Sequence, residues 1–456
     1  MTSTHPLVPL KPWKPFLGRP LLPARPPSDP ATYPSLPSSI RKQPFSTFTL
    51  STHIIPAVHL RRGPRLPIPK LPSDDLSKDE KTYLTEKLSE GFQRNMQDPI
   101  IKNDKHENVL WNVLNRYVKK GLTSSESTGI TLFFAHANGF PKEIWEPILA
   151  RIFESPVSGM IDEVWAWESV QHGDAGLINA AALTSFFDWS DNTRDIFNFL
   201  LHFLPSMPCD KTLPVHLARV SKEESQQRVQ RGFQSRTLIL IGHSFGGTSL
   251  ALGAYHYPKI PSSIILVDPT MMRPEYSDAV TEIVGKWGLK AINNALRRKD
   301  TWKSKEEALI EFSSSPYYAT WDRDMLKTYI EFALYDTTVT TPTGETKPVA
   351  RLKLAPFHEA LVFAGGDVPL EAFACLPDLD ERIRLHWIVS GAKGAPEFGA
   401  PGAQQERVWV RPKNSSNTRI NRAGHLVPQE GAPEFAQDLI QFLQRHYSNR
   451  TIRASL

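Results

Sequence analysis

The fold of this chain is decided by one stretch, Thr237-Leu238-Ile239-Leu240-Ile241-Gly242-His243-Ser244-Phe245-Gly246. Its apolar first half predicts a strand buried on both faces, and Gly247 to Leu252 predict a helix that ends before Pro258. Between strand and helix lies the pattern G-x-S-x-G, whose glycines permit a turn tight enough to lift the Ser244 hydroxyl above the sheet. The N-terminus of the following helix favours negative charge beside that hydroxyl. We therefore predict that Ser244 is a nucleophile rather than an idle serine in a glycine-rich turn.

Short apolar runs of the same kind recur along the chain, and helical patterns separate them. Two polar or amphipathic helices are expected at Lys81–Phe92 and Val109–Tyr117. Strands that alternate with helices predict an α/β fold with a mostly parallel central sheet flanked by helices. The expected strands are Phe48–Ile55, Ile130–Ala135, Val164–Trp167, Thr237–Ile241, Ser263–Val267 and Arg384–Val389.

A serine hydroxyl is a poor nucleophile until a histidine removes its proton. After a short expected strand at Asn417–Ile420 the sequence reads Ala423-Gly424-His425-Leu426-Val427-Pro428, and a C-terminal helix is expected from Pro433. The chain has 14 histidines, and a lone histidine is ordinarily structural. His425 is selected by its order and its position on a loop after the last strand, and we predict that it is the general base.

The order Ser, acid, His around a G-x-S-x-G turn resembles the α/β-hydrolase family. The run Phe134-Ala135-His136-Ala137-Asn138-Gly139-Phe140-Pro141 is similar to the oxyanion loop of fungal peroxisomal lipases and toxin-biosynthesis hydrolases. The resemblance covers about residues 45–447 and implies an oxyanion hole formed by the backbone N–H groups of Asn138 and Phe245. Further similar stretches are Ser51–Pro56, Val164–Ala166, His172–Asp174, Asp188–Ser190, Leu266–Pro269 and Gly424–Pro428.

The acid that would complete a Ser-His-acid triad has two possible positions. Asp268 ends the strand after the G-x-S-x-G turn, and a carboxylate there can reach the histidine loop across the strand tops. The commoner position in the resembling family follows the next strand, where Gly394 stands in place of an aspartate and Glu397 is the alternative acid. We predict Asp268, for which a structural role, capping the turn into Pro269, is the other interpretation.

Charge and proline content divide the chain. Residues 1–72 contain ten Lys or Arg against one acid, and 17 of the 39 prolines. We therefore predict that residues 1–43 are a disordered, basic, Pro-rich extension. Residues 44–272 and 381–456 are predicted to form the two parts of the hydrolase core.

The stretch from 273 to 380 is far longer than a crossover between two strands needs. It is predicted to be a helical lid inserted into the core. Its helices are expected to begin at the capping box of Ser304, at Asp322 or Asp324, and at Pro356.

Other classes of protein are excluded by composition and motifs. No run of 18 uncharged apolar residues predicts a membrane-spanning helix. Two cysteines, Cys209 and Cys375, cannot form a disulfide scaffold and fit a reducing compartment. No zinc or phosphate-loop pattern occurs, so we expect no metal and no cofactor. No basic patch interleaved with aromatic residues indicates a nucleic-acid partner.

These observations predict a serine hydrolase that cleaves an ester or thioester of a small hydrophobic acyl substrate. The alternatives are acyl transfer or C–C bond hydrolysis by the same serine, and a catalytically silent, hydrolase-like binding scaffold. An intracellular location, cytoplasmic or peroxisomal, is expected. The ending Ala454-Ser455-Leu456 is a poor peroxisomal signal, because Ser455 replaces the basic middle residue. The sequence does not indicate an oligomeric state.

Overall fold

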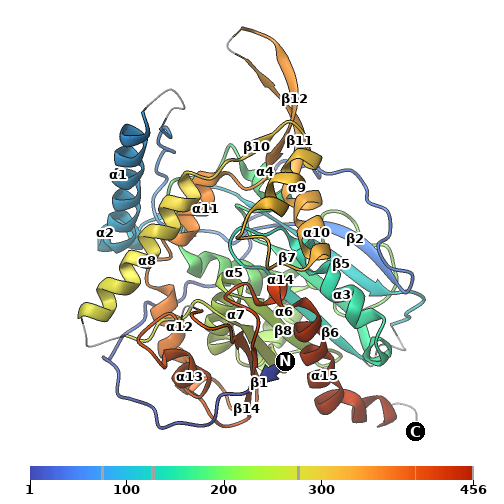
Figure 1. Cartoon of the computed structure of the whole chain (residues 1–456). Coiled ribbons are helices and arrows are strands. Elements are labelled where there is room, and N and C mark those ends of the chain that lie inside the picture. The colour runs from blue at the N-terminus through green and yellow to red at the C-terminus, as the bar shows by residue number, and fades with distance from the viewer. Residues whose placement is uncertain are drawn as a thin grey trace.

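The computed structural model describes residues 1–456 except 73–76, 125, 126, 128, 275–277, 342, 396 and 454–456. Within the described residues nine strands form one sheet in the order β1-β14-β13-β9-β8-β6-β7-β5-β2 (Figure 1). The neighbours from β14 to β7 are parallel, whereas β1, β5 and β2 pair antiparallel. The strands are β1 Thr2–Ser3, β2 Phe48–Pro56, β5 Trp111–Lys119, β6 Ile130–Ala135, β7 Ile161–Glu168, β8 Thr237–His243, β9 Ser263–Val267, β13 Arg384–Ser390 and β14 Ser415–Ile420.

Helices and two small sheets complete the described chain. No single described helix is long and apolar enough to cross a membrane, although the segments Pro356–Phe363 and Val368–Asp378, bent by 44°, pass that test as a pair. The small sheets are β3 Arg61–Arg62 with β4 Lys105–His106, and β10 Thr301–Trp302 with β12 Thr346–Leu352 and β11 Leu334–Thr340. The helices are α1 Lys78–Gln97, α2 Pro99–Asn103, η1 Lys142–Trp145, α3 Glu146–Phe153, η2 Pro156–Met160, α4 Gly173–Asn179, α5 Trp189–Asn198, η3 Phe199–Phe203, α6 Lys222–Arg231, α7 Phe245–His256, α8 Asp278–Leu296, α9 Lys305–Ser314, α10 Arg323–Ala333, α11 Pro356–Phe363, α12 Val368–Cys375, η4 Leu376–Asp378, α13 Ala403–Val408, α14 Val427–Glu430 and α15 Ala432–Arg453.

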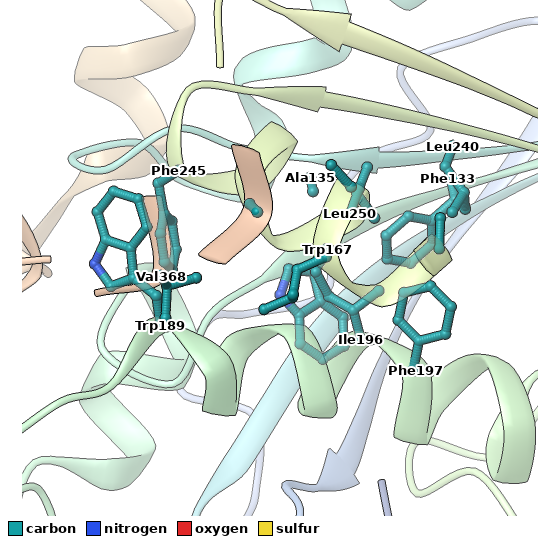
Figure 2. Packing of buried hydrophobic residues seen from close by; sticks show 14 of the residues in the cluster. Phe133, Ala135, Trp167, Trp189, Ile196, Phe197, Leu240, Phe245, Leu250 and Val368 are labelled. Carbon is teal, nitrogen blue, oxygen red and sulfur yellow. The ribbon is translucent and has the colours of Figure 1, made fainter. Parts of the chain in front are cut away.

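The central strands are buried on both faces, as their uninterrupted apolar runs predict. In β6, Phe133 belongs to the hydrophobic core on one face and Phe134 to the core on the other. Helices α5, α7 and α12 cover the first face, and α3 and α15 cover the second. Figure 2 shows the first face, where the rings of Trp189 and Phe245 pack edge to face with their centroids 4.8 Å apart. The predicted α/β fold with helices on both faces of a mostly parallel sheet is confirmed.

One element differs from its prediction. The stretch 109–117, expected to be an amphipathic helix, contributes to strand β5. Its apolar residues at Trp111 and Leu114 fit a helical spacing as well as a strand. Pairing decides in favour of the strand, because β2 on one side and β7 on the other supply backbone partners for β5. Arg116 is buried against Glu163 of β7 at 3.0 Å.

The region 273–380 contains the expected helices and an additional sheet. The Ser304 hydroxyl accepts from the N–H of Glu307 at the start of α9, Asp322 caps α10, and Pro356 begins α11. The three-stranded sheet of β10, β12 and β11 was not predicted. Its hairpin of β11 and β12 projects from the body of the molecule at the top of Figure 1, and α8 lies beside α1.

Residues 1–43 contain no helix, as their prolines predict, but they lie against the core. The guanidinium of Arg19 contacts Asp188 and Glu371, each at 2.6 Å, and Arg41 contacts Glu146 at 2.6 Å. Ala24 is buried in the core on the α7 face. This differs from the disordered extension that was predicted, because the basic residues of the segment meet acidic partners on the folded core.

Candidate active site

Ser244 stands at the junction of β8 and α7 in a strained backbone conformation, with φ 51° and ψ −118°. The flanking glycines allow this turn. A Cβ on Gly242 would lie 2.7 Å from the Cα of Gly247, and a Cβ on Gly246 would lie 2.5 Å from the carbonyl oxygen of Ala135. A side chain at Gly242 would therefore push α7 away from β8, and one at Gly246 would push the turn away from β6, so the G-x-S-x-G pattern is a requirement of this geometry.

His425, on the loop between β14 and α14, meets Ser244 as the sequence predicts. Its Nε2 lies 2.9 Å from the Ser244 Oγ, and its Nδ1 lies 2.8 Å from the Oδ2 of Asp268. The side chain of Asp268 is fully buried, whereas that of His425 is 26% exposed. The three residues form one hydrogen-bonded row that is open to solvent at its histidine.

Of the two acids considered from the sequence, only Asp268 lies beside His425. Glu397 accepts hydrogen bonds from the backbone N–H groups of Gly402 and Gln404 at 2.8 and 3.3 Å, and so caps the start of α13. The second carboxylate oxygen of Asp268 accepts from the N–H of Ser390 at 3.2 Å. These contacts fix the orientation of Asp268. The contacts of Glu397, in contrast, give that carboxylate a role in capping α13.

His243 and Thr270 also contact this part of the site and were missed from the sequence. His243 donates from Nε2 to the carbonyl oxygen of His425 at 2.9 Å. Burial, with the nearby His425, lowers the pKa of His243 to about 3, so it stays neutral. It ties the histidine loop to the G-x-S-x-G turn at Ser244, here called the elbow. The Oγ1 of Thr270 lies 2.9 Å from the Ser244 Oγ. His243 occupies the x position of G-x-S-x-G and could have been found there; Thr270 has no motif.

The loop after β6 brings Asn138 close to the elbow. Among the described residues, neither the backbone N–H of Asn138 nor that of Phe245 donates to a protein acceptor. The Asn138 side chain donates to the carbonyl oxygen of Glu359 in α11 at 3.0 Å, and its Oδ1 lies 3.1 Å from the Nε2 of His172. The loop is therefore held from both the core and the 273–380 region.

A buried ionic cluster supports this loop from below. Lys142 has no exposed side-chain surface and lies 2.9 Å from Asp174 and 3.2 Å from Glu168. Burial opposes its charge, but Asp174 and its other acidic neighbours outweigh burial and raise the Lys142 pKa well above its ordinary value. Burial raises the pKa of Glu168 to about 7. Pairing of such charges fixes the geometry of the loop, because any displaced member would be left alone in the interior.

A cavity of about 550 Å³ opens over Ser244 and His425. At one side Arg298 contacts both carboxylate oxygens of Glu359, at 3.0 and 2.8 Å, and the hydroxyls of Tyr318 and Tyr329. Burial opposes the charge of Arg298, but Glu359 and the tyrosines outweigh it, and the pKa of Arg298 is raised well above its ordinary value. The rest of the wall is largely aromatic and apolar, with Phe140, Tyr317, Trp321, Ala295, Phe363 and Leu426. Such a cavity fits an apolar organic group with a small number of polar anchors.

No group of three or more His, Cys, Asp or Glu side chains suited to a metal ion occurs among the residues that the structure describes. Both cysteines, Cys209 and Cys375, are free.

Comparison with known proteins gives related sequences and folds. The chain is 28% identical over 204 residues to the "Type I acyl-CoA thioesterase mpaH" of Penicillium roqueforti (strain FM164), which is 44% of this chain and 40% of that protein. It is 24% identical over 221 residues to the "Peroxisomal membrane protein LPX1" of Saccharomyces cerevisiae, covering 46% of this chain and 50% of that protein. The chain therefore matches half or less of the length of these curated relatives.

The solved structure of the "Peroxisomal alpha-beta-hydrolase Lpx1" from S. cerevisiae superposes with a TM-score of 0.55 at 16% identity, over 88% of this chain and 90% of that one. This agreement concerns the fold. Residues 132–438 match the family described as "Alpha/beta hydrolase family". That stretch includes the elbow, the loop after β6 and the histidine loop, and it confirms the predicted fold family: the chain belongs to the alpha/beta hydrolase family.

Proposed function

We propose that this protein is a serine hydrolase that cleaves a carboxylic ester or thioester of a hydrophobic acyl group. The observation that carries the proposal is the row Ser244–His425–Asp268, with contacts of 2.9 and 2.8 Å, beneath a largely apolar cavity. An inactive scaffold would have no need for a strained serine in contact with a histidine and a buried carboxylate.

The geometry supports the following reaction. His425 takes the hydroxyl proton of Ser244 as the serine oxygen attacks the acyl carbon, and Asp268 stabilises the imidazolium that forms. The negative charge on the carbonyl oxygen is bound by the N–H groups of Asn138 and Phe245 at the start of α7. His425 then returns the proton to the leaving alcohol or thiol. Water, activated by the same histidine, releases the acid from the acyl-serine.

A thioester is the first substrate to try, because a relative with 28% identity is named an acyl-CoA thioesterase. The aromatic wall of the cavity supports an acyl group that is bulky and apolar rather than short. A panel of acyl thioesters and matched oxygen esters of increasing acyl length would separate the two classes through kcat/KM. We expect the longer or aromatic acyl groups to be the better substrates in both series.

The direct test is labelling by a fluorophosphonate, which reacts with a serine that is activated by a neighbouring histidine. We expect the full chain to be labelled at Ser244, and neither Ser244→Ala nor His425→Ala to react. Thr270→Val is the matched control, because it removes a hydroxyl contact to the same serine but leaves the Ser–His–Asp row intact; it should still be labelled. A folded wild-type protein that resists the probe and hydrolyses no ester would contradict the proposal in favour of a binding scaffold.

The compartment stays a prediction of cytoplasm or peroxisome. The tripeptide Ala454-Ser455-Leu456 lies outside the described residues, and one relative is named a peroxisomal protein. A fluorescent fusion with a free C-terminus should give puncta that disappear when residues 454–456 are deleted. A diffuse signal from both fusions would contradict peroxisomal targeting by this tripeptide.

A further inference from the structure

The N-terminal segment Thr2–His5 is held at the edge of the sheet by strand pairing and side-chain hydrogen bonds. Thr2 and Ser3 pair with β14 as strand β1. Asn417 of β14 then contacts both backbone groups of His5: its Oδ1 accepts from the N–H at 2.7 Å, and its Nδ2 donates to the carbonyl oxygen at 3.1 Å. The indole N–H of Trp409 donates to the same carbonyl at 3.0 Å. The backbone of His5 is thus fixed by three side-chain hydrogen bonds.

From this position the His5 side chain begins a row of hydrogen bonds that ends at Asp268. Its Nε2 donates to the Oε1 of Gln404 at 2.8 Å. The Nε2 of Gln404 donates to the Oγ of Ser390 at 2.8 Å and, more weakly, to the Oδ1 of Asp268 at 3.4 Å. Gln404, Ser390 and Asp268 are all buried, with at most 4% of their surface exposed. The other oxygen of Asp268 contacts His425.

Asp268 and His5 favour the same direction of the Gln404 amide. If the amide were reversed, its oxygen would face the buried carboxylate of Asp268, and two acceptors would oppose each other. A donor on His5 favours the orientation in which the amide oxygen points outward and the amide nitrogen points to Asp268. Asp268 itself has φ 37°, a conformation that needs support from its surroundings.

We propose that the segment Thr2–His5 is a positioning element of the active site, in which His5 and Gln404 act as positioning residues for Asp268. The inference rests on the proposed function, since it assigns these residues to the same Ser–His–Asp row. Neither His5 nor Gln404 lines the cavity over Ser244, so we expect the segment to act on kcat and not on substrate binding. It also gives the ordered N-terminal residues a role that a solvated arm would not have.

The test compares four single variants in the full chain: Gln404→Leu, His5→Leu, His5→Gln and, as the matched control, Gln405→Leu. Gln405 donates to the carbonyl oxygen of Pro6 at 3.0 Å, so its replacement removes a contact with the residue that follows the segment but none with the acid. We expect Gln404→Leu to lower kcat for an ester about 10- to 100-fold, since small misplacements of a catalytic group cost that much, with KM changed less than about twofold. His5→Leu should lower kcat about 5- to 10-fold by the same loss of orientation.

The conservative variant and the control separate the loss of one hydrogen bond from a general loss of stability. A glutamine at position 5 can donate to Gln404, so His5→Gln should recover most of the lost kcat, and Gln405→Leu should behave as wild type. The double variant His5→Leu/Gln404→Leu should be no slower than Gln404→Leu alone, because both act through one row. Thermal melting of each variant reports whether it folds. If Gln404→Leu does not fold, the pair His5→Leu and His5→Gln at the half-buried position 5 decides the question.

The outcomes separate this inference from the function on which it rests. A wild-type protein that neither hydrolyses an ester nor reacts with a fluorophosphonate overturns both. A wild type that reacts, together with His5→Leu and Gln404→Leu that keep the wild-type kcat, overturns only the positioning role. Equal losses in His5→Leu, His5→Gln and Gln405→Leu also overturn it, because they would show a general effect of the segment on stability.

Discussion

Backbone strain is concentrated around His425. Of the four described non-glycine residues with a positive φ, Ser244 and Asp268 are its hydrogen-bonding partners, and the ring of Phe398 lies 4.9 Å from its imidazole. Each such conformation costs about 1–3 kcal/mol and persists only where surrounding contacts over-determine it. Here the contacts come from β6, β13 and α13, so the site is held by residues that are far apart in the sequence.

The first prediction separates the two acids. We expect Asp268→Asn to lower kcat/KM by about 10⁴-fold, because an amide cannot stabilise the imidazolium of His425 or hold its tautomer. Glu397→Gln should stay within about tenfold of wild type, because Glu397 only caps the turn into α13 and an amide oxygen still accepts there. Ester hydrolysis by the two variants checks this, with melting temperature as the control for folding. The opposite pattern would assign the acid to the loop after β13.

Residues in the row differ in how well the sequence could predict them. Ser244 and His425 stand in local patterns, and Asp268 stands at a strand end that faces the same edge of a parallel sheet. Gln404 could not be found in this way, because it reaches Asp268 across 136 positions of sequence. No pattern of residue types marks a contact of that kind, and only the folded loop between β13 and α13 brings the two together.

At the scale of elements, the sequence predicted the starts of helices better than the pairing of strands. The caps at Ser304 and Asp322 act on neighbouring backbone N–H groups, so their positions were correct. The hairpin of β11 and β12 was missed, although Leu334–Thr340 is rich in β-branched residues and Gly344 follows it at φ 82°. A β-branched run followed by a glycine is a standard hairpin pattern. It was missed because the insertion was expected to be entirely helical.

The second prediction concerns the contacts through which Arg298 joins α10 and α11, here called the joint. Arg298 binds Glu359 of α11 and Tyr329 of α10, and Glu359 is 8% exposed. We expect Arg298→Met to lower the free energy of unfolding by about 3 kcal/mol, because it leaves a buried carboxylate without its partner. Arg298→Met/Glu359→Gln should recover part of that loss, as measured by urea unfolding.

The same pair of variants also tests the cavity. Since Arg298 and Glu359 line it, the KM for a long acyl substrate should rise in Arg298→Met more than the KM for an acetyl ester. If the double variant is less stable than Arg298→Met, then Glu359 is stabilised by groups other than Arg298, and the joint is not formed by this ion pair.

At the scale of the whole molecule, the sequence predicted one α/β core but not how the chain is arranged around it. Composition indicated an N-terminal segment without helices, and residues 1–43 contain none. It could not show that Arg19 and Arg41 have buried acidic partners, because Asp188, Glu371 and Glu146 lie more than a hundred positions away. The net charge of a segment depends only on its own residues, whereas its order depends on the partners that the rest of the fold provides for them.

The last prediction concerns buried histidines, which are distributed over the whole fold. Burial lowers the pKa of His53, His136 and His358 to about 4, and that of His243 to about 3, from an ordinary value of 6.5. Between those values the unfolded chain binds protons that the folded chain does not, so the free energy of unfolding rises with pH in this window. Their stabilising effect is complete above pH 6.5 and is lost as the pH falls toward 4, by about 1.4 kcal/mol per pH unit for each histidine. Glu168, whose pKa is raised to about 7 by burial, opposes this, as do Asp162 and Asp195, whose pKa values burial also raises.

We therefore expect urea unfolding to show a steep loss of stability from pH 6.5 to pH 4.5. His358 lies in α11, outside the Ser–His–Asp row, and its Nδ1 is buried without a hydrogen-bond partner among the described residues. His358→Leu should reduce the slope of the free energy of unfolding against pH by about 1.4 kcal/mol per pH unit, because one proton fewer is bound on unfolding. Ser244→Ala should keep the wild-type slope, because no titrating group is changed. A stability that is constant or increases toward pH 4.5 would mean that these histidines become protonated inside the folded protein, and that the interior admits water at acid pH.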